Sequence, residues 1–187
     1  MRKVKILIMG RTGTGKTTSE EYLSKYFNLK GLKSFTTRPK RDKDDNNHIF
    51  ISEEEAKQYT DRVSETTING YEYFATVDQL DESDIYVIDP LGAKKLLSNY
   101  PDYDYIMILM SANDELAKYK TRSRNNFDYE SRKHSEDNQF LEIENSPFPE
   151  ELFENSNSIK KFYNVQSLNF TDMYEDLNKI GSELKLI

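Results

Sequence analysis

The amino-acid sequence predicts an α/β fold built around a central parallel sheet. Three apolar runs carry this prediction: residues 3–9, residues 85–90, and residues 105–110, which read YIMILM. Continuous apolar runs are typical of parallel strands, because such strands are buried on both faces. Segments with helical spacing of apolar residues follow these runs, and strands that alternate with helices indicate a layered α/β domain.

Local signals place the remaining elements. Ser52 and Glu55 form a capping box, which predicts the start of a helix. Asn69-Gly70 lies between two β-rich runs within residues 62–76, a pattern typical of a β-hairpin. Apolar spacing and residue type predict helices at 16–27, 90–97, 115–145 and 171–184, and short strands at 48–51 and 162–165.

The chain is expected to form a single domain over residues 1–187. The stretch 34–76 is polar and contains the hairpin, so it interrupts the alternation of strands and helices and is interpreted as an inserted lobe. The stretch 121–145 is helical in pattern but crowded with charge. The core is then expected to comprise residues 1–33, 77–120 and 146–187.

Composition excludes several classes of function. The formal net charge of −7 disfavours a nucleic-acid partner, and the absence of cysteine excludes disulfides and thiolate chemistry. No apolar run approaches the ~20 residues of a membrane span. The chain begins with a strand-like run and leaves no room for a signal peptide. We therefore expect a cytoplasmic protein without a membrane partner, as a monomer or weak homodimer.

The segment GRTGTGKT directly after the first strand matches the pattern G-x-x-x-x-G-K-[ST]. Glycines let backbone amides approach phosphate oxygens, and the helix that follows directs its positive end to the same place. In this pattern the lysine reaches the β- and γ-phosphates of ATP, and Thr17 contacts Mg²⁺. The alternative is a glycine-rich turn with a surface lysine. The predicted ATP-binding residues are Gly10, Arg11, Thr12, Gly13, Thr14, Gly15, Lys16, Thr17 and Thr18, in a P-loop NTPase-type three-layer fold.

A second basic segment, SFTTRPKR at 34–41, places Arg38 and Arg41 three residues apart. Two guanidinium groups offer forked donors to a dianionic phosphate. The alternative is a solvated basic loop. Because the segment follows a phosphate-binding motif, we interpret it as the binding site of a second phosphate.

SFTTRPKR, NGYEYFAT and VIDPLG together resemble segments of the guanylate kinase family, in the same order along the chain. The resemblance implies ATP-dependent phosphorylation of a nucleoside monophosphate (NMP), GMP or dGMP first, with Mg²⁺ as cofactor and a role in purine nucleotide metabolism. It makes 34–76 the NMP-binding lobe and 121–145 a lid. The implied NMP-binding residues are Ser34, Arg38, Arg41, His48, Glu65, Tyr73 and Asp89. Without the resemblance, Asp89 would be interpreted as a helix cap before Pro90.

The sequence departs from the family pattern at three positions of the acceptor site. His48 stands where the family has a tyrosine, and Ala75 replaces a hydroxyl residue. Ser64 occupies the place of the glutamate that reads guanine, with Glu65 one residue away. A site that loses hydrogen bonds to a base edge loses discrimination, so the identity of the base stays open.

The charged stretch after the third strand supplies the predicted catalytic arginines. Arg122 and Arg132 are the preferred pair, with Arg124 as the substitute, and Lys16 acts with them on the transferred phosphoryl group. The alternative is a charged helix face with i,i+4 pairs. No general base is needed, because the acceptor is already an anionic phosphate oxygen.

Two other functions remain open beside a guanylate kinase-like enzyme. One is a non-catalytic interaction module of guanylate kinase type, and the other is a P-loop kinase for a different NMP or small acceptor. A GTPase switch would need an N-K-x-D motif to read guanine, and the chain contains none.

Overall fold

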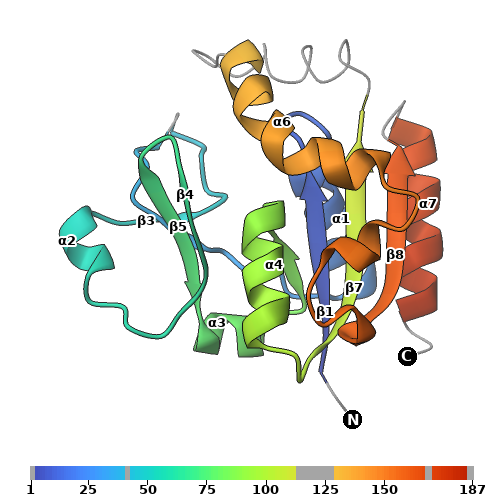
Figure 1. The fold of residues 1–187 in the computed structure, drawn as a ribbon, viewed down its shortest axis with the longest axis horizontal. Helices are drawn as coiled ribbons and strands as arrows, with labels where there is room; N and C mark the ends of the chain where they lie inside the picture. Colours follow the sequence, from blue (N-terminus) through green and yellow to red (C-terminus); the bar gives the residue numbers. More distant parts are fainter. Residues whose placement is uncertain (1–2, 41–42, 113–128, 167–169, 185–187) are drawn as a thin grey trace.

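The computed structural model describes the chain except for residues 1–2, 41–42, 113–128, 167–169 and 185–187. Its centre is a four-stranded sheet in the order β6–β1–β7–β8, in which all neighbouring strands are parallel (Figure 1). The strands are β1 (Val4–Gly10), β6 (Ile85–Val87), β7 (Asp104–Ser111) and β8 (Ile159–Gln166). The predicted central parallel sheet is therefore confirmed.

Side chains of β1 alternate between two apolar cores. Ile6 and Ile8 pack into one core and Leu7 and Met9 into the other, and each is at most 2% exposed. Successive residues of a strand point to opposite faces, so burial on both faces produces the continuous apolar run seen in the sequence.

Helices cover both faces of the central sheet. One core contains Leu23 and Leu177, from α1 (Lys16–Phe27) and α7 (Phe170–Leu184). The other core contains side chains from α4 (Pro90–Asn99) and α6 (Tyr129–Asn145), and is closed by the 3-10 turns Pro149–Leu152 and Ser156–Ser158. These are the three layers of the predicted α/β fold, and no helix within the described ranges is long and apolar enough to cross a bilayer.

A second, smaller sheet lies beside α4 and takes its strands from the polar stretch before β6 (Figure 1). Its order is β3–β2–β5–β4, and it has its own small core around Phe35, Ala56 and Phe74. The strands are β2 (Phe35–Thr36), β3 (Ile49–Phe50), β4 (Arg62–Ile68) and β5 (Tyr71–Thr76). The β4–β5 hairpin turns at Asn69-Gly70, where both residues have positive φ, as predicted from the sequence.

Capping boxes explain two short helices. Helix α2 (Glu53–Ala56) begins after Ser52, whose hydroxyl accepts from the Glu55 amide, as the sequence predicts. Helix α3 (Val77–Glu82) was not expected, although Thr76 and Gln79 form a second capping box at its start. A search for the T-x-x-Q spacing would have found it.

Strand β6 is shorter than the run 85–90 suggested. It ends at Val87, and Asp89 caps α4 by accepting a hydrogen bond from the Gly92 amide at 2.9 Å. Pro90 has no amide hydrogen to donate to a strand ladder, and proline is well suited to the first turn of a helix. The chain therefore leaves the strand before the proline.

Candidate functional site

The glycine-rich segment forms the loop between β1 and α1. Gly10 ends the strand, and a Cβ on it would lie 2.6 Å from the Met110 carbonyl oxygen, so only glycine fits there. Gly15 precedes α1 with φ 94°, a left-handed conformation that favours glycine. The first turn of α1 contains no acidic residue, so no carboxylate of the helix itself opposes the positive end of its dipole at the loop.

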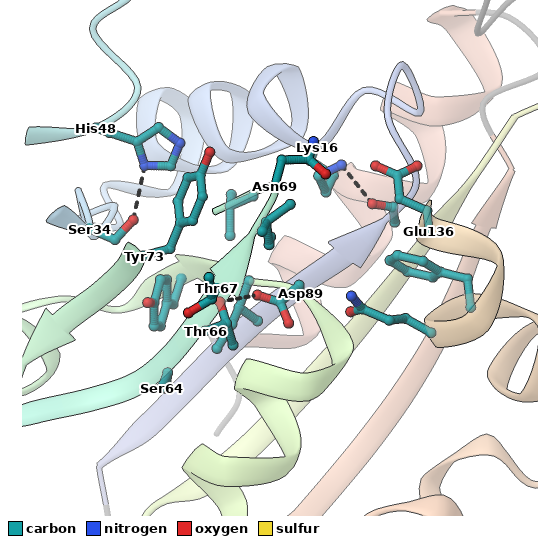
Figure 2. Close-up of a pocket in the computed structure, with 17 residues that line it drawn as sticks. Lys16, Ser34, His48, Ser64, Thr66, Thr67, Asn69, Tyr73, Asp89 and Glu136 are labelled. Carbon is teal, nitrogen blue, oxygen red and sulfur yellow. Dashed lines mark hydrogen bonds between the residues drawn. The ribbon is translucent and has the colours of Figure 1, made fainter. Parts of the chain in front are cut away.

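Lys16 reaches back over this loop. Its Nζ donates to the carbonyl oxygen of Gly10 at 2.6 Å (Figure 2). It also donates to the carbonyl oxygen of Arg11 at 2.8 Å. Thr14, only 2% exposed, holds the same turn because its hydroxyl donates to the Arg11 carbonyl at 2.8 Å. The ammonium group thus lies at the mouth of the loop, beside the amides that begin α1.

Carboxylates from α6 contact the loop from the other side. Glu136 accepts from the Thr12 amide at 2.9 Å and from the Thr12 hydroxyl at 2.6 Å. Arg11 donates to Glu144 through two nitrogens, each at 2.8 Å, and to Asp137 at 2.5 Å. These carboxylates raise the pKa of Arg11, through the Glu144 hydrogen bonds first. Contact of Arg11 and Thr12 with ATP stays a prediction.

A pocket of about 280 Å³ opens next to the loop (Figure 2). Gly10 and Lys16 line one part of it, and α6 contributes Glu136, Gln139 and Phe140. Four of the predicted NMP-binding residues line it from the second sheet and the end of β6. These are Ser34, His48, Tyr73 and Asp89. The pocket therefore joins the glycine-rich loop to four of the seven predicted NMP-binding residues.

Hydrogen bonds fix the pocket side chains (Figure 2). The Ser34 hydroxyl lies 3.0 Å from His48 Nδ1, and the His48 ring meets Tyr73 edge-on at 5.5 Å. Asp89 Oδ2 accepts from the Thr66 hydroxyl at 3.0 Å while its other oxygen caps α4. Asp89 thus caps α4, as one interpretation of the sequence predicts, and also lines the pocket, whereas its contact with an acceptor nucleotide stays a prediction.

Neither of the two arginines that were predicted to bind the acceptor phosphate is among the described residues that line the pocket. Arg38 is 8% exposed and pairs with Asp45 at 2.9 Å, while its Nε has no hydrogen-bond partner within the described ranges. Arg41 lies outside those ranges. Glu65 does not line the pocket, and its carboxylate pairs with Arg62 instead.

Only some of the residues predicted for the lid and for the magnesium site lie within the described ranges. Arg122 and Arg124 lie outside the described residues, and Arg132 belongs to α6 by its backbone, with its side chain outside them. Thr17 lies in the first turn of α1, partly buried, one residue after Lys16. Among the residues that the structure describes, no group of three or more His, Asp or Glu side chains is arranged to hold a metal ion.

Sequence reasoning did not identify the α6 side of the pocket. Glu136, Gln139 and Phe140 are three and four residues apart, so they share one helix face. The sequence shows this spacing. It does not show that this helix face contacts the glycine-rich loop, because no local pattern links the face to a loop more than a hundred residues earlier.

Comparisons with known proteins bear on the fold. No family model matches the chain, and neither does any curated protein. Among solved structures, a guanylate kinase from Anaplasma phagocytophilum matches with a TM-score of 0.58 and 16% identity, covering 99% of this chain and 86% of that one. An uncharacterized protein from Eubacterium ventriosum matches with a TM-score of 0.44 and 11% identity, covering 97% of this chain and 98% of that one. The first match supports the P-loop NTPase-like fold.

Proposed function

We propose that this protein transfers a phosphoryl group from ATP to a nucleoside monophosphate, with GMP and dGMP as the first acceptors to test. One observation carries the proposal: the pocket is lined both by Gly10 and Lys16 of the glycine-rich loop and by Ser34, His48 and Tyr73 of the second sheet and its flanks. A donor phosphate on the loop and an acceptor nucleotide on the sheet would therefore meet in one cavity.

The loop supplies the donor side of the reaction. Lys16 and the amides at the start of α1 would hold the β- and γ-phosphates of ATP, because both place positive charge at the same point. Thr17 fits a magnesium contact, since its hydroxyl belongs to the same helical turn. Bound Mg²⁺ would neutralise phosphate charge.

The second sheet supplies the acceptor side. The Nε of Arg38, which has no hydrogen-bond partner within the described ranges, would donate to the acceptor phosphate, and Arg41 is the second predicted donor. An oxygen of that phosphate attacks the γ-phosphorus of ATP, and the bond from the γ-phosphorus to the β–γ bridging oxygen breaks. The products are ADP and the nucleoside diphosphate. The lid arginines Arg122 and Arg132, or Arg124, would stabilise charge on the phosphoryl group in transfer.

A non-catalytic binding module is the second candidate, and one observation favours it. Arg11 and Thr12 of the loop contact three carboxylates of α6, and a loop held in this way need not bind ATP. The two functions differ in turnover, so an assay of ADP release separates them.

The test is a coupled ADP-release assay across GMP, dGMP, AMP, CMP, UMP and dTMP, with wild-type protein and Lys16→Ala. We expect turnover with at least one monophosphate and its loss in K16A by a factor of roughly a hundred or more, since the lysine stabilises the transferred charge. Lys25→Ala, from the last turn of the same helix, is the matched control and should stay active. Absence of turnover with every acceptor would refute the kinase.

A further inference from the structure

Ser64 combines two unfavourable features at one position. Its side chain lines the pocket and the residue is only 5% exposed, yet its hydroxyl has no hydrogen-bond partner within the described ranges. Burial of a polar group without a partner is unfavourable, because the group gives up its hydrogen bonds to water. The Ser64 backbone is also left-handed, with φ 55°, a conformation that is unfavourable in a residue other than glycine.

The backbone around Ser64 explains where its side chain points. The pairing of β4 with β5 shifts register between Val63 and Thr66, so Ser64 lies in a bulge of the strand. A glycine at position 64 would adopt the left-handed backbone without strain, and an alanine would bury no hydroxyl. Serine has both disadvantages at this position. Strain of this kind, in a residue that lines a cavity, points to a ligand contact.

A second residue that lines the same pocket, from another element, also has a polar atom without a partner in the described part of the chain. Gln139 of α6 lines the cavity, and its buried Oε1 has no hydrogen-bond partner in the described part of the chain. Two neutral groups from β4 and α6 are therefore available to one ligand.

The carboxylates near the pocket are already engaged. Each oxygen of Asp89 accepts a hydrogen bond from the fold, and Glu136 accepts two from Thr12. Glu65 is turned away toward Arg62. Among the described residues that line the pocket, the buried polar atoms without a partner therefore belong to a neutral hydroxyl and a neutral amide. These are the groups that we expect to bind a base.

This distinction matters because guanine carries two adjacent donors, N1–H and the 2-amino group. A carboxylate meets both with charge-assisted bonds, whereas one hydroxyl offers a single neutral bond of about half the strength. Hypoxanthine, the base of IMP, keeps N1–H and O6 and lacks only the 2-amino group. The ratio of activity on GMP to activity on IMP therefore reports whether a carboxylate reads the base.

We propose that Ser64 and Gln139 bind the acceptor base through neutral hydrogen bonds, so that the site accepts IMP about as well as GMP. This inference rests on the proposed function, and it names the acceptors as 6-oxopurine monophosphates without selection for the 2-amino group. A site that lacks a charged partner for that group loses only one neutral bond when the group is absent.

The test measures kcat/KM and, by calorimetry, Kd for GMP and IMP on the same wild-type protein. We expect the two acceptors to differ by less than about tenfold, the equivalent of one neutral hydrogen bond. A preference for GMP of a hundredfold or more would overturn the inference, as would failure of both nucleotides to bind. Binding of both without turnover would exclude GMP and IMP as acceptors of the kinase, and the binding ratio would then decide the inference.

Variants at Ser64 make the test specific. Ser64→Ala should weaken binding of GMP and IMP alike, by about threefold to tenfold, while leaving the Kd for ATP unchanged. Ser64→Glu should raise the GMP-to-IMP ratio at least tenfold, because it restores a carboxylate. Ser158→Ala removes a buried hydroxyl outside the pocket and is the control. Unchanged acceptor binding in S64A would overturn the assignment even if S64E fails to fold.

Discussion

The carboxylate of Glu136 accepts two hydrogen bonds from Thr12, one from the backbone amide at 2.9 Å and one from the hydroxyl at 2.6 Å. Thr12 lies in the middle of the glycine-rich loop, where a backbone amide is expected to face a phosphate oxygen. A carboxylate and a phosphate are both oxygen anions, so Glu136 and a nucleotide would compete for the same donor.

Replacing Glu136 with glutamine should therefore strengthen ATP binding. Glutamine keeps a carbonyl oxygen for the Thr12 amide but removes a negative charge near the predicted phosphate position. We expect the Kd for ATP, measured by calorimetry, to fall about threefold to tenfold, which corresponds to roughly 1 kcal/mol of relieved repulsion. Glu142→Gln makes the same change on an exposed position of α6 and should have little effect. Equal gains in both variants would indicate a long-range charge effect and contradict a local competition.

Replacing Arg11 with alanine should loosen α6. The Arg11 side chain is 17% exposed and joins Asp137 and Glu144, so its loss leaves two carboxylates without their common partner. Partly buried, bidentate pairs contribute more than exposed ones. We expect amide hydrogen exchange in the second half of α6 to accelerate by about tenfold, or roughly 1.4 kcal/mol.

Lys94→Ala is the control for this change. Lys94 of α4 pairs with Glu142 of α6 at 3.8 Å, and both side chains are substantially exposed. Its loss should leave exchange in α6 nearly unchanged. If R11A and K94A behave alike, the Arg11 contacts do not hold the helix on the loop.

The sequence predicts most of the secondary structure of this protein because its signals are local. The apolar run 105–110, the Ser52 capping box and the Asn69-Gly70 turn each act within a few residues, and each element is found where it was expected. Helix α3 was missed although its capping box is equally local. The glycine-rich loop was recognised because its geometry depends on residues that are consecutive in the chain.

The rest of the site depends on contacts that no local pattern encodes. Thr12 and Glu136 are 124 residues apart, and their meeting depends on how α6 packs over the sheet. The left-handed backbone of Ser64 results from a shift in strand register, which the residue types alone do not set. The pairing of Arg38 with Asp45 could likewise not be predicted, because the sequence shows only a basic stretch followed by an acidic one.

The Arg38–Asp45 pair should be important for stability. The side chains are 9% and 5% exposed, so removal of the carboxylate leaves a buried guanidinium without its partner. We expect Asp45→Ala to lower the free energy of unfolding in urea by about 3 kcal/mol, within the range seen when one partner of a buried pair is removed. Asp44→Ala, at an exposed neighbouring position, should change it by less than about 0.5 kcal/mol. Similar losses in both variants would show that the loop, and not the pair, is being destabilised.

Glu20 should make stability depend on pH. Burial raises the pKa of its carboxyl group to about 7, and the neighbouring Glu21 adds to this shift. In the unfolded chain the group titrates near 4.3. Below that value both states are protonated, and between about 4.3 and 7 only the unfolded chain ionises. The free energy of unfolding should therefore fall as pH rises through this window, and this contribution should be constant above it.

Glu20→Gln removes this titration while keeping the shape of the side chain. The variant should be more stable than wild type at pH 8, by roughly 1–3 kcal/mol given about 1.4 kcal/mol per pKa unit, and the difference should vanish near pH 4. Urea unfolding at the two pH values measures this change. Glu21→Gln carries the same substitution at the adjacent exposed position but keeps Glu20, so it should retain most of the wild-type pH dependence, reduced only by the loss of the Glu21 charge. A constant difference between E20Q and wild type at both pH values would mean that Glu20 titrates alike in the folded and unfolded protein, which contradicts the raised pKa.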